Sequence, residues 1–258
     1  VPSAPRAVAT LAGTVRGVAM AGQFAYALTL VPGNPAHTDL VVVDLRAPAA
    51  PAVAGRATLA GGSDLKVVGS LVYVAADGAG LQIVDVGNPS APAIVGTVDT
   101  PGTATAVAVA NGHAYVADDT ALEVVDVVNP ARPVIVGSLA TRSTAVAVAA
   151  GRAYMLDGGL QLKIVDVSVP AAPALLSATR GFGAQGIDVA GTLAVLATPA
   201  ANHDPTAGLY VVDVSNAARP QLVKQVLVPG TVRTVTAAGG AVYVGDGAAL
   251  VDVVTLVP

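Results

Sequence analysis

Cysteine and tryptophan are absent from this sequence of 258 residues, and aromatic residues make up only 3% of it. Without cysteine there is no disulfide bond, thiolate metal site or thiol nucleophile, but the compartment stays open because a large closed domain needs no disulfides. Charge is also scarce, with 12% charged residues and a net charge of −4. This balance excludes the basic character of a nucleic-acid-binding protein, and we expect neither nucleic acid nor a cofactor.

Long hydrophobic runs are missing too, although 53% of the residues are hydrophobic and the mean hydropathy is +0.68. A membrane-spanning helix needs about 18 or more consecutive apolar residues. Proline, glycine or aspartate interrupts every candidate, and the stretch that comes closest, residues 186–200, contains Asp188 and Gly191. We therefore expect no membrane span within this chain, and we expect any signal peptide or anchor to lie outside it.

One phrase that ends in Val-Asp recurs six times along the chain. Its aspartates are separated by 41, 41, 40, 47 and 39 residues. They are Asp44, Asp85, Asp126, Asp166, Asp213 and Asp252. A period of about 40 residues is typical of stacked sheets and solenoids, which indicates six copies of one structural unit.

Each copy predicts four short antiparallel strands and no helix. Prolines four and seven residues after most of the aspartates mark a corner, because proline cannot extend a strand ladder. The aliphatic run that follows predicts an outer strand, and Val/Ala-rich runs joined by tight turns predict the inner ones. Strands that are buried on both faces explain why the composition is so aliphatic.

Six such units predict an all-β fold, a single-domain six-bladed β-propeller of four-stranded antiparallel blades. The predicted blades cover residues 13–60, 61–101, 102–142, 143–182, 183–229 and 230–258. Residues 2–11 match a corner and an outer strand, so we expect an N-terminal strand at residues 4–12 to close the ring by pairing in the last blade. A parallel solenoid with capped ends is the alternative.

The phrases Leu81-Gln-Ile-Val-Asp85 and Leu162-Lys-Ile-Val-Asp166, with the proline corner after them, resemble the LVIVD-repeat propellers of bacterial and archaeal surface or secreted proteins. The resemblance covers the whole chain and implies a propeller and export, to a secreted, periplasmic or cell-surface location, but no particular reaction. The sixth copy departs from the pattern in its leading leucine, and the fifth copy has Ala217 in place of the first proline.

The six repeated aspartates have two interpretations. As a ring of carboxylates they would be functional, whereas directly before a corner each one can accept backbone N–H bonds that the turn leaves open. We favour the structural role, because a catalytic pair would break the sixfold equivalence.

Strand order assigns the remaining charges to two ends of the blades. Aspartates of the second hairpin turn gather at one end, and they are Asp39, Asp77, Asp118, Asp119, Asp157, Asp204 and Asp246. Arginines gather at the other end, and they are Arg46, Arg132, Arg152 and Arg219. We predict an acidic and a basic face, with ordinary turn carboxylates and scattered surface arginines as the alternative.

Two copies carry extra residues at the acidic end. The first insertion contains Asn34, His37 and Asp39, and the second contains Asn202, His203 and Asp204. These residue types would suit Ca²⁺ or Zn²⁺ if the loops met. Because the two blades are two steps apart, we expect flexible rim loops or a partner-binding surface instead, and no metal site.

The starts of the innermost strands predict the lining of the channel mouth. Arg16 and Arg233 fall there in neighbouring blades and would bind a small anion, with Asp64 beside them. A water-filled polar entrance is the alternative. Asp188 falls inside an innermost strand, where a buried carboxylate needs a hydrogen-bond partner.

Three functions follow, in order of preference. The first is a non-catalytic binding or scaffold module of an exported bacterial protein, which docks another protein or a surface polymer and is open to a larger assembly. A Ser/His/Asp set, a phosphate-binding glycine loop and paired glutamates are all missing, which disfavours an enzyme.

The second function is a hydrolase or lyase with Arg16 and Arg233 as anion clamps and Asp64 as general base. The third is a Ca²⁺-dependent adhesion module. Because aromatic anchors are few, we expect a polar or backbone-mediated interface.

Overall fold

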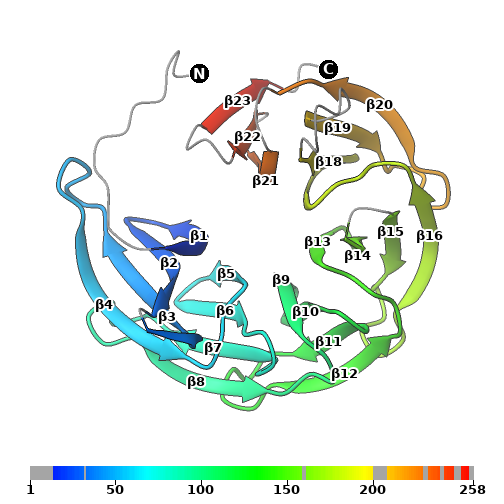
Figure 1. Ribbon diagram of the computed structural model, residues 1–258. Coiled ribbons are helices and arrows are strands. Elements are labelled where there is room, and N and C mark those ends of the chain that lie inside the picture. Colours follow the sequence, from blue (N-terminus) through cyan, green and yellow to red (C-terminus); the bar gives the residue numbers. More distant parts are fainter. Residues whose placement is uncertain are drawn as a thin grey trace. The chain divides into compact units, whose positions relative to one another are not determined.

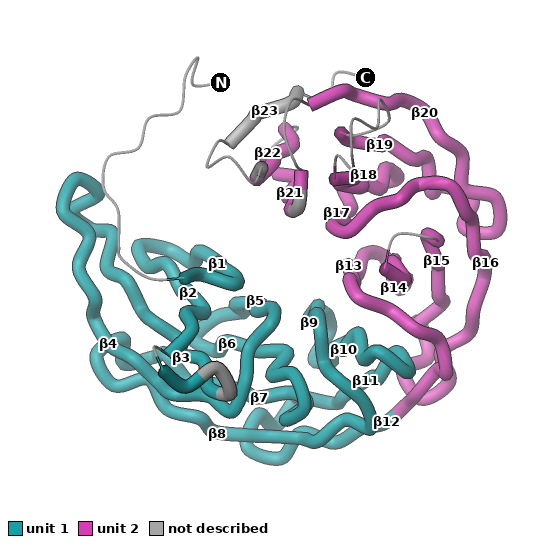
Figure 2. Tube along the Cα trace, in the orientation of Figure 1, with its two compact units in different colours: residues 1–136 teal, residues 137–258 magenta. Residues whose placement is uncertain are grey.

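A computed structural model describes residues 14–31, 33–158, 161–199, 208–228, 232–238, 241–246 and 251–255, with the backbone alone for 35, 36, 233, 246 and 251–255. In these residues the regular structure is all strand, so the all-β prediction is confirmed. The same residues include no helix that could cross a membrane. The chain divides into two compact units, residues 1–136 and 137–258 (Figure 2).

Unit 1 contains two complete sheets and most of a third (Figure 1). The first sheet consists of β1 (Val15–Ala21), β2 (Phe24–Val31), β3 (Asn34–Asp44) and β4 (Ala52–Leu59). The second sheet consists of β5 (Asp64–Val68), β6 (Leu71–Ala75), β7 (Leu81–Asp85) and β8 (Ala93–Val98). The third sheet consists of β9 (Ala104–Ala110), β10 (His113–Asp118), β11 (Leu122–Asp126) and β12 (Val134–Leu139), which runs into unit 2.

Unit 2 holds the other sheets (Figure 1). One consists of β13 (Ala145–Ala149), β14 (Arg152–Leu156), β15 (Gln161–Asp166) and β16 (Ala174–Arg180). The next consists of β17 (Gly186–Ala190), β18 (Leu193–Thr198), β19 (Gly208–Asp213) and β20 (Gln221–Val226). The last consists of β21 (Val232–Ala238), β22 (Ala241–Asp246) and β23 (Val251–Thr255).

In every described sheet the strands follow one another in chain order and pair antiparallel, as predicted for the blades. Five of the described sheets have four strands and the last has three. Each sheet lies within one of the predicted blade ranges. The segment expected to supply a fourth strand to the last sheet, residues 4–12, lies outside the described residues.

The first insertion, expected to form a rim loop or a partner-binding surface, is built mainly of paired strands. Pairing between β2 and β3 continues from Phe24 and Asp44 out to Val31 and Asn34, with one irregularity near the tip. The insertion is therefore a long hairpin arm. Its polar residues are tolerated because one face of an antiparallel pair can face water.

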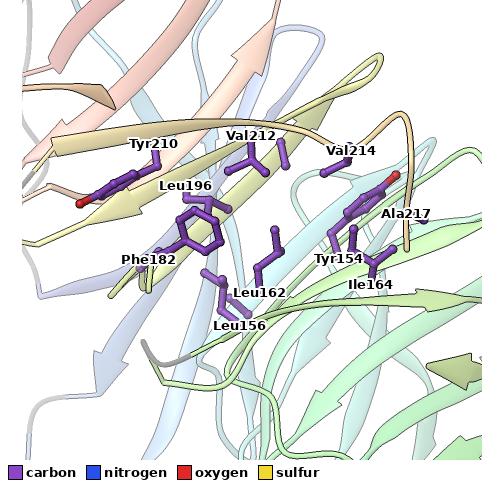
Figure 3. Close-up of a cluster of buried hydrophobic side chains, with 13 residues drawn as sticks. Tyr154, Leu156, Leu162, Ile164, Phe182, Leu196, Tyr210, Val212, Val214 and Ala217 are labelled. Atoms are coloured by element: carbon purple, nitrogen blue, oxygen red, sulfur yellow. The ribbon is translucent and has the colours of Figure 1, made fainter. Parts of the chain in front are cut away.

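Aliphatic side chains fill the space between successive sheets. In unit 2, Figure 3 shows Tyr154, Leu156 and Ile164 of one sheet with Leu196 and Val212 of the next, and all of them are buried. Phe182 packs edge to face on Tyr210, with their ring centroids 5.9 Å apart. The second strands, such as β6, β14 and β18, are buried at nearly every position. Small Val and Ala side chains suit strands that are buried at positions on both faces.

Outer strands pack closely against the corner of the next repeat at one repeated position. A Cβ atom added to Gly96 of β8 would overlap the carbonyl oxygen of Pro130, and Gly137 of β12 stands in the same relation to Pro170. Ser177 occupies this position in β16, and its hydroxyl donates a 2.6 Å hydrogen bond to the carbonyl of Ala217. In this repeat, Ser177 replaces the glycine of the outer strand, and the corner that it contacts has Ala217 in place of the first proline.

Candidate functional site

The repeated aspartates hold the corners of the first five repeats. In each, one carboxylate oxygen accepts the backbone N–H two residues later, at 2.8–2.9 Å. The acceptors are Asp44, Asp85, Asp126, Asp166 and Asp213. These contacts agree with the structural interpretation of the five aspartates, and the side chain of Asp252 lies outside the described residues.

Hydrogen bonds also make three of these carboxyls more acidic than usual. The side chain of Arg46 lowers the pKa of Asp44, with a further contribution from the Arg46 N–H. Side-chain and backbone bonds from Ser168 lower the pKa of Asp166, and the backbone N–H and side chain of Ser215 lower the pKa of Asp213. These groups are therefore ionised acceptors at neutral pH.

Arg16 of the first repeat, which we predicted to bind an anion, forms an ion pair with an aspartate of the chain. Its Nη1 lies 3.3 Å from Oδ2 of Asp77. The same carboxylate accepts hydrogen bonds from the backbone N–H of Gly62 and from the hydroxyl of Ser63. An incoming anion would have to compete with Asp77 for this guanidinium. The side chain of Arg233 lies outside the described residues.

Asp64, the suggested general base, bridges two innermost strands. Its oxygens accept the N–H groups of Leu65 at 2.8 Å and of Val107 in β9 at 3.0 Å. Burial raises the pKa of Asp64 above its ordinary value, although both hydrogen bonds oppose the rise. The side chain thus supports the edge of the neighbouring inner strand.

Asp188 has the partner that we predicted for it. It accepts the N–H of Val189 at 2.8 Å and the N–H of Ala237 in β21 at 2.9 Å. Asp64 and Asp188 therefore connect successive inner strands in the same manner, one in each unit.

Residues of the first insertion have separate partners along the hairpin arm. Nδ1 of His37 lies 3.2 Å from the carbonyl oxygen of Leu59, while Asp39 accepts a 2.7 Å hydrogen bond from the hydroxyl of Thr58. Asn34 lies at the exposed tip. Within the described residues no three His, Asp or Glu side chains could hold a metal together. Asn202, His203 and Asp204 lie outside those residues.

Carboxylates of the predicted acidic face have hydrogen-bond or ion-pair partners in the turns and segments around them. Asp118 is buried and accepts hydrogen bonds from Gly102 N–H at 2.7 Å and from the backbone and hydroxyl of Thr120. Burial raises the pKa of Asp118, but these bonds outweigh it and lower the pKa overall. Arg56 lies 3.7 Å from Asp39. These contacts favour the alternative interpretation, ordinary turn carboxylates.

Buried polar residues in the third strands were not predicted. Gln82 accepts the N–H of Ala60 at 3.1 Å, and Lys163 donates to the carbonyl of Arg142 at 2.9 Å. Lys163 also lies 3.5 Å from Asp157. Both side chains tie the strand to the segment that enters its own sheet. The sequence did contain a signal for them, because Gln82 and Lys163 are polar residues within the otherwise aliphatic phrases that end in Val-Asp.

The LVIVD repeat family model matches residues 12–58, 61–100, 101–141, 142–179 and 203–228. The chain belongs to the LVIVD repeat family. The resemblance seen in the repeated phrases is thereby confirmed, and the matched segments cover the first five copies of the repeat.

Solved structures show that the LVIVD chain has a β-propeller fold. A candidate 6-phosphogluconolactonase from Bacteroides uniformis is 9% identical with a TM-score of 0.77, over 93% of this chain and 80% of that one. BamB from Moraxella catarrhalis is 13% identical with a TM-score of 0.60, over 93% and 83%. The computationally designed Ika8 protein is 12% identical with a TM-score of 0.66, over 95% and 71%. Identities this low concern the fold alone. The comparison with curated proteins gave no match.

The outer strands of the LVIVD repeats expose aliphatic side chains to solvent. At one or both of the positions just after the corner, each of the five presents a valine, isoleucine or leucine. These exposed residues include Val53, Ile94, Val134, Leu175 and Leu222. The sequences of β4, β8, β12, β16 and β20 contain no acidic residue. The aliphatic runs in the sequence predicted these strands. They did not predict that aliphatic side chains of the strands would be exposed to solvent.

Proposed function

We propose that this LVIVD chain is a non-catalytic binding and scaffold propeller of an exported bacterial protein, and that it docks a partner protein or surface polymer. The observation that carries the proposal is the repeated exposure of aliphatic side chains on the outer strands, among them Ile94, Leu175 and Leu222. Exposed apolar patches on a well-packed scaffold mark interaction surfaces.

The contacts of the candidate site residues support binding over the two other functions. A hydrolase or lyase would need Arg16 and Asp64 available for substrate, whereas one is paired with Asp77 and the other accepts two backbone N–H groups. A Ca²⁺-dependent module would need oxygens that converge, whereas His37 and Asp39 contact different residues of β4.

The proposal includes a closed ring of six blades in a single domain. Residues Pro2-Ser-Ala-Pro5 repeat Pro89-Ser-Ala-Pro92 letter for letter, and the latter form the corner before outer strand β8. The last described sheet has three strands. We infer that residues 4–12 supply its fourth strand, which would pair with β23.

Capture by the immobilised chain tests the binding function. Extracts of the cell envelope and medium of a source culture are passed over the wild type and over an I94D/L175D/L222D variant. We expect a reproducible protein or polymer on the wild type and its loss from the variant. An Asn111→Asp variant, changed in the exposed turn between β9 and β10, should retain it.

Two results would contradict the proposal. One is reproducible turnover of a substrate by a chain that captures nothing. The other is a native protein found in the cytosolic fraction of its source cells, which would contradict export.

A further inference from the structure

We propose that Asn111 is a site of spontaneous covalent modification, at which attack by the backbone nitrogen of Gly112 expels the side-chain amide and leaves a carboxylate, in part as isoaspartate. The reaction needs only water. It concerns a single turn of unit 1 and goes beyond the proposed binding function, on which it does not depend.

Asn111 and Gly112 form the two-residue turn between β9 and β10 (Figure 1). Ala110 of β9 pairs directly with His113 of β10. Both turn residues have a positive φ, +50° at Asn111 and +74° at Gly112, as a type I′ hairpin turn requires. Glycine adopts this conformation without strain and has no Cβ to shield its nitrogen. The turn thus places an unshielded backbone nitrogen directly after an asparagine.

Both reacting groups are accessible in this turn. Asn111 is exposed. Among the described residues, no hydrogen bond is made by its side-chain amide or by the N–H of Gly112. The turn is held by its carbonyl groups instead, since Val127 N–H donates to the oxygen of Gly112 at 2.9 Å and Nδ1 of His113 lies 3.0 Å from the oxygen of Asn111. Attack requires rotation about the Cα–C bond of Asn111, which local opening of an exposed turn allows.

His113 favours the reaction through the carbonyl group of Asn111. Because a carbonyl oxygen only accepts, the contact is a hydrogen bond when Nδ1 carries the proton. That oxygen and the nitrogen of Gly112 belong to the same peptide group. A donor at the oxygen stabilises the negative charge that develops on this group as the N–H proton leaves. The imidazole therefore makes the nitrogen a better nucleophile.

The chemical step needs no oxidant, reductant or cofactor. The nitrogen of Gly112 bonds to Cγ of Asn111, the Cγ–Nδ2 bond breaks, and Nδ2 leaves as ammonia with the proton of the Gly112 N–H. Water then opens the resulting five-membered imide. Cleavage between the nitrogen and Cγ gives aspartate, whereas cleavage between the nitrogen and the main-chain carbonyl carbon gives isoaspartate. Either product adds a negative charge to the turn.

The other asparagines of the described residues lack this arrangement. The chain has six asparagines. Proline, which has no N–H to lose, follows Asn34, Asn88 and Asn129. Asn216 precedes alanine, and its Oδ1 accepts the N–H of Ala218 at 3.1 Å. Asn202 lies outside the described residues. Asn216 therefore provides an internal control for Asn111.

Peptide mapping by mass spectrometry tests the proposal on the full, folded chain. The protein is kept for several weeks at about 37 °C and neutral pH, conditions under which labile asparagines convert, and a zero-time sample corrects for conversion during digestion. We expect conversion at Asn111 to be at least about tenfold faster than at Asn216, whose following residue carries a Cβ. Part of the product should be isoaspartate, which is identified by fragmentation of its additional main-chain Cα–Cβ bond.

Variants of His113 test the assistance by the imidazole. His113→Leu should slow the conversion by about threefold or more, because the donor to the Asn111 carbonyl is lost. His113→Gln keeps a side-chain N–H donor and should recover part of the rate. His37→Leu is the matched control, since His37 contacts the carbonyl of Leu59 in another sheet, and it should convert at the wild-type rate. In urea, where these contacts are lost, all four chains should convert equally.

Several results would overturn the proposal. Conversion at Asn111 no faster than at Asn216, or conversion in urea but not in the folded chain, would show that the turn protects its asparagine. Aspartate without any isoaspartate would show direct hydrolysis of the amide instead of attack by the Gly112 nitrogen. A folded His113→Leu variant that converts as fast as the wild type would overturn the role of the imidazole.

Discussion

Carboxylates in the first five repeats serve the backbone. The repeated aspartates accept N–H groups at the corners, Asp118 accepts them in a hairpin turn, and Asp64 and Asp188 accept them from a neighbouring inner strand. An ionised acceptor strengthens such a bond. These eight carboxylates of the described residues thus accept backbone N–H groups.

Asp118→Asn should destabilise the protein by about 2 kcal/mol, because charge-assisted bonds to a buried carboxylate are lost. The pKa of Asp118 is lowered in the folded state, so its contribution is present above about pH 4 and is lost as pH falls through the folded value. Urea unfolding at pH 7 and pH 3 measures both effects. The difference between wild type and variant should shrink at pH 3.

Asp99→Asn, at an exposed position between β8 and β9, is the control and should change stability by less than about 0.5 kcal/mol. An Asp118→Asn variant as stable as Asp99→Asn at pH 7 would contradict the role assigned to the buried carboxylate.

Asp64 should show the opposite pH dependence. Burial raises its pKa, so the folded state holds the proton more tightly than the unfolded state does. Ionisation therefore weakens folding as pH rises from about 4 through the folded value. Asparagine keeps one acceptor oxygen and carries no charge. The unfolding free energy of Asp64→Asn relative to wild type should rise between pH 4 and pH 7, and a constant difference would exclude a costly buried charge.

Outer strands depend on one close approach to the next corner. Gly96→Ala should lower the unfolding free energy by about 1–3 kcal/mol, because the new methyl group meets the carbonyl of Pro130. Gly78→Ala is the matched control, since open space surrounds a Cβ there, and it should be nearly neutral. Thermal unfolding of both variants measures the difference. Equal midpoints would show that the corner moves freely away from β8.

Corners and strand order were predictable from sequence because their signals are local. Proline, Asp and tight-turn residues determine the backbone within a few residues, and the period repeats them. The hairpin arm at Asn34 and His37 was not predictable, because its pairing depends on cross-strand contacts that composition does not encode. The same holds for Lys163, whose partner is the carbonyl of Arg142 some 21 residues away, and for Arg16, whose partner Asp77 belongs to the next repeat.

Across the whole molecule, the proposed ring requires the two ends of the chain to complete one blade. Without closure, the side of β23 that faces away from β22 would remain an open sheet edge, and such edges promote aggregation. Closure would also set the number of blades, because an open stack has no fixed count. The aliphatic composition suits either arrangement, so composition alone does not decide between them.

Thermal unfolding of a chain that lacks residues 1–12 tests the closed ring most directly. We expect the midpoint to fall by about 10 °C or more, since a lost strand costs several kcal/mol in a protein of this size, and an added peptide of residues 1–13 should restore part of the loss. Deletion of residues 1–3 alone is the control and should have little effect. A truncated chain that unfolds at the wild-type temperature would contradict closure by the N-terminal strand.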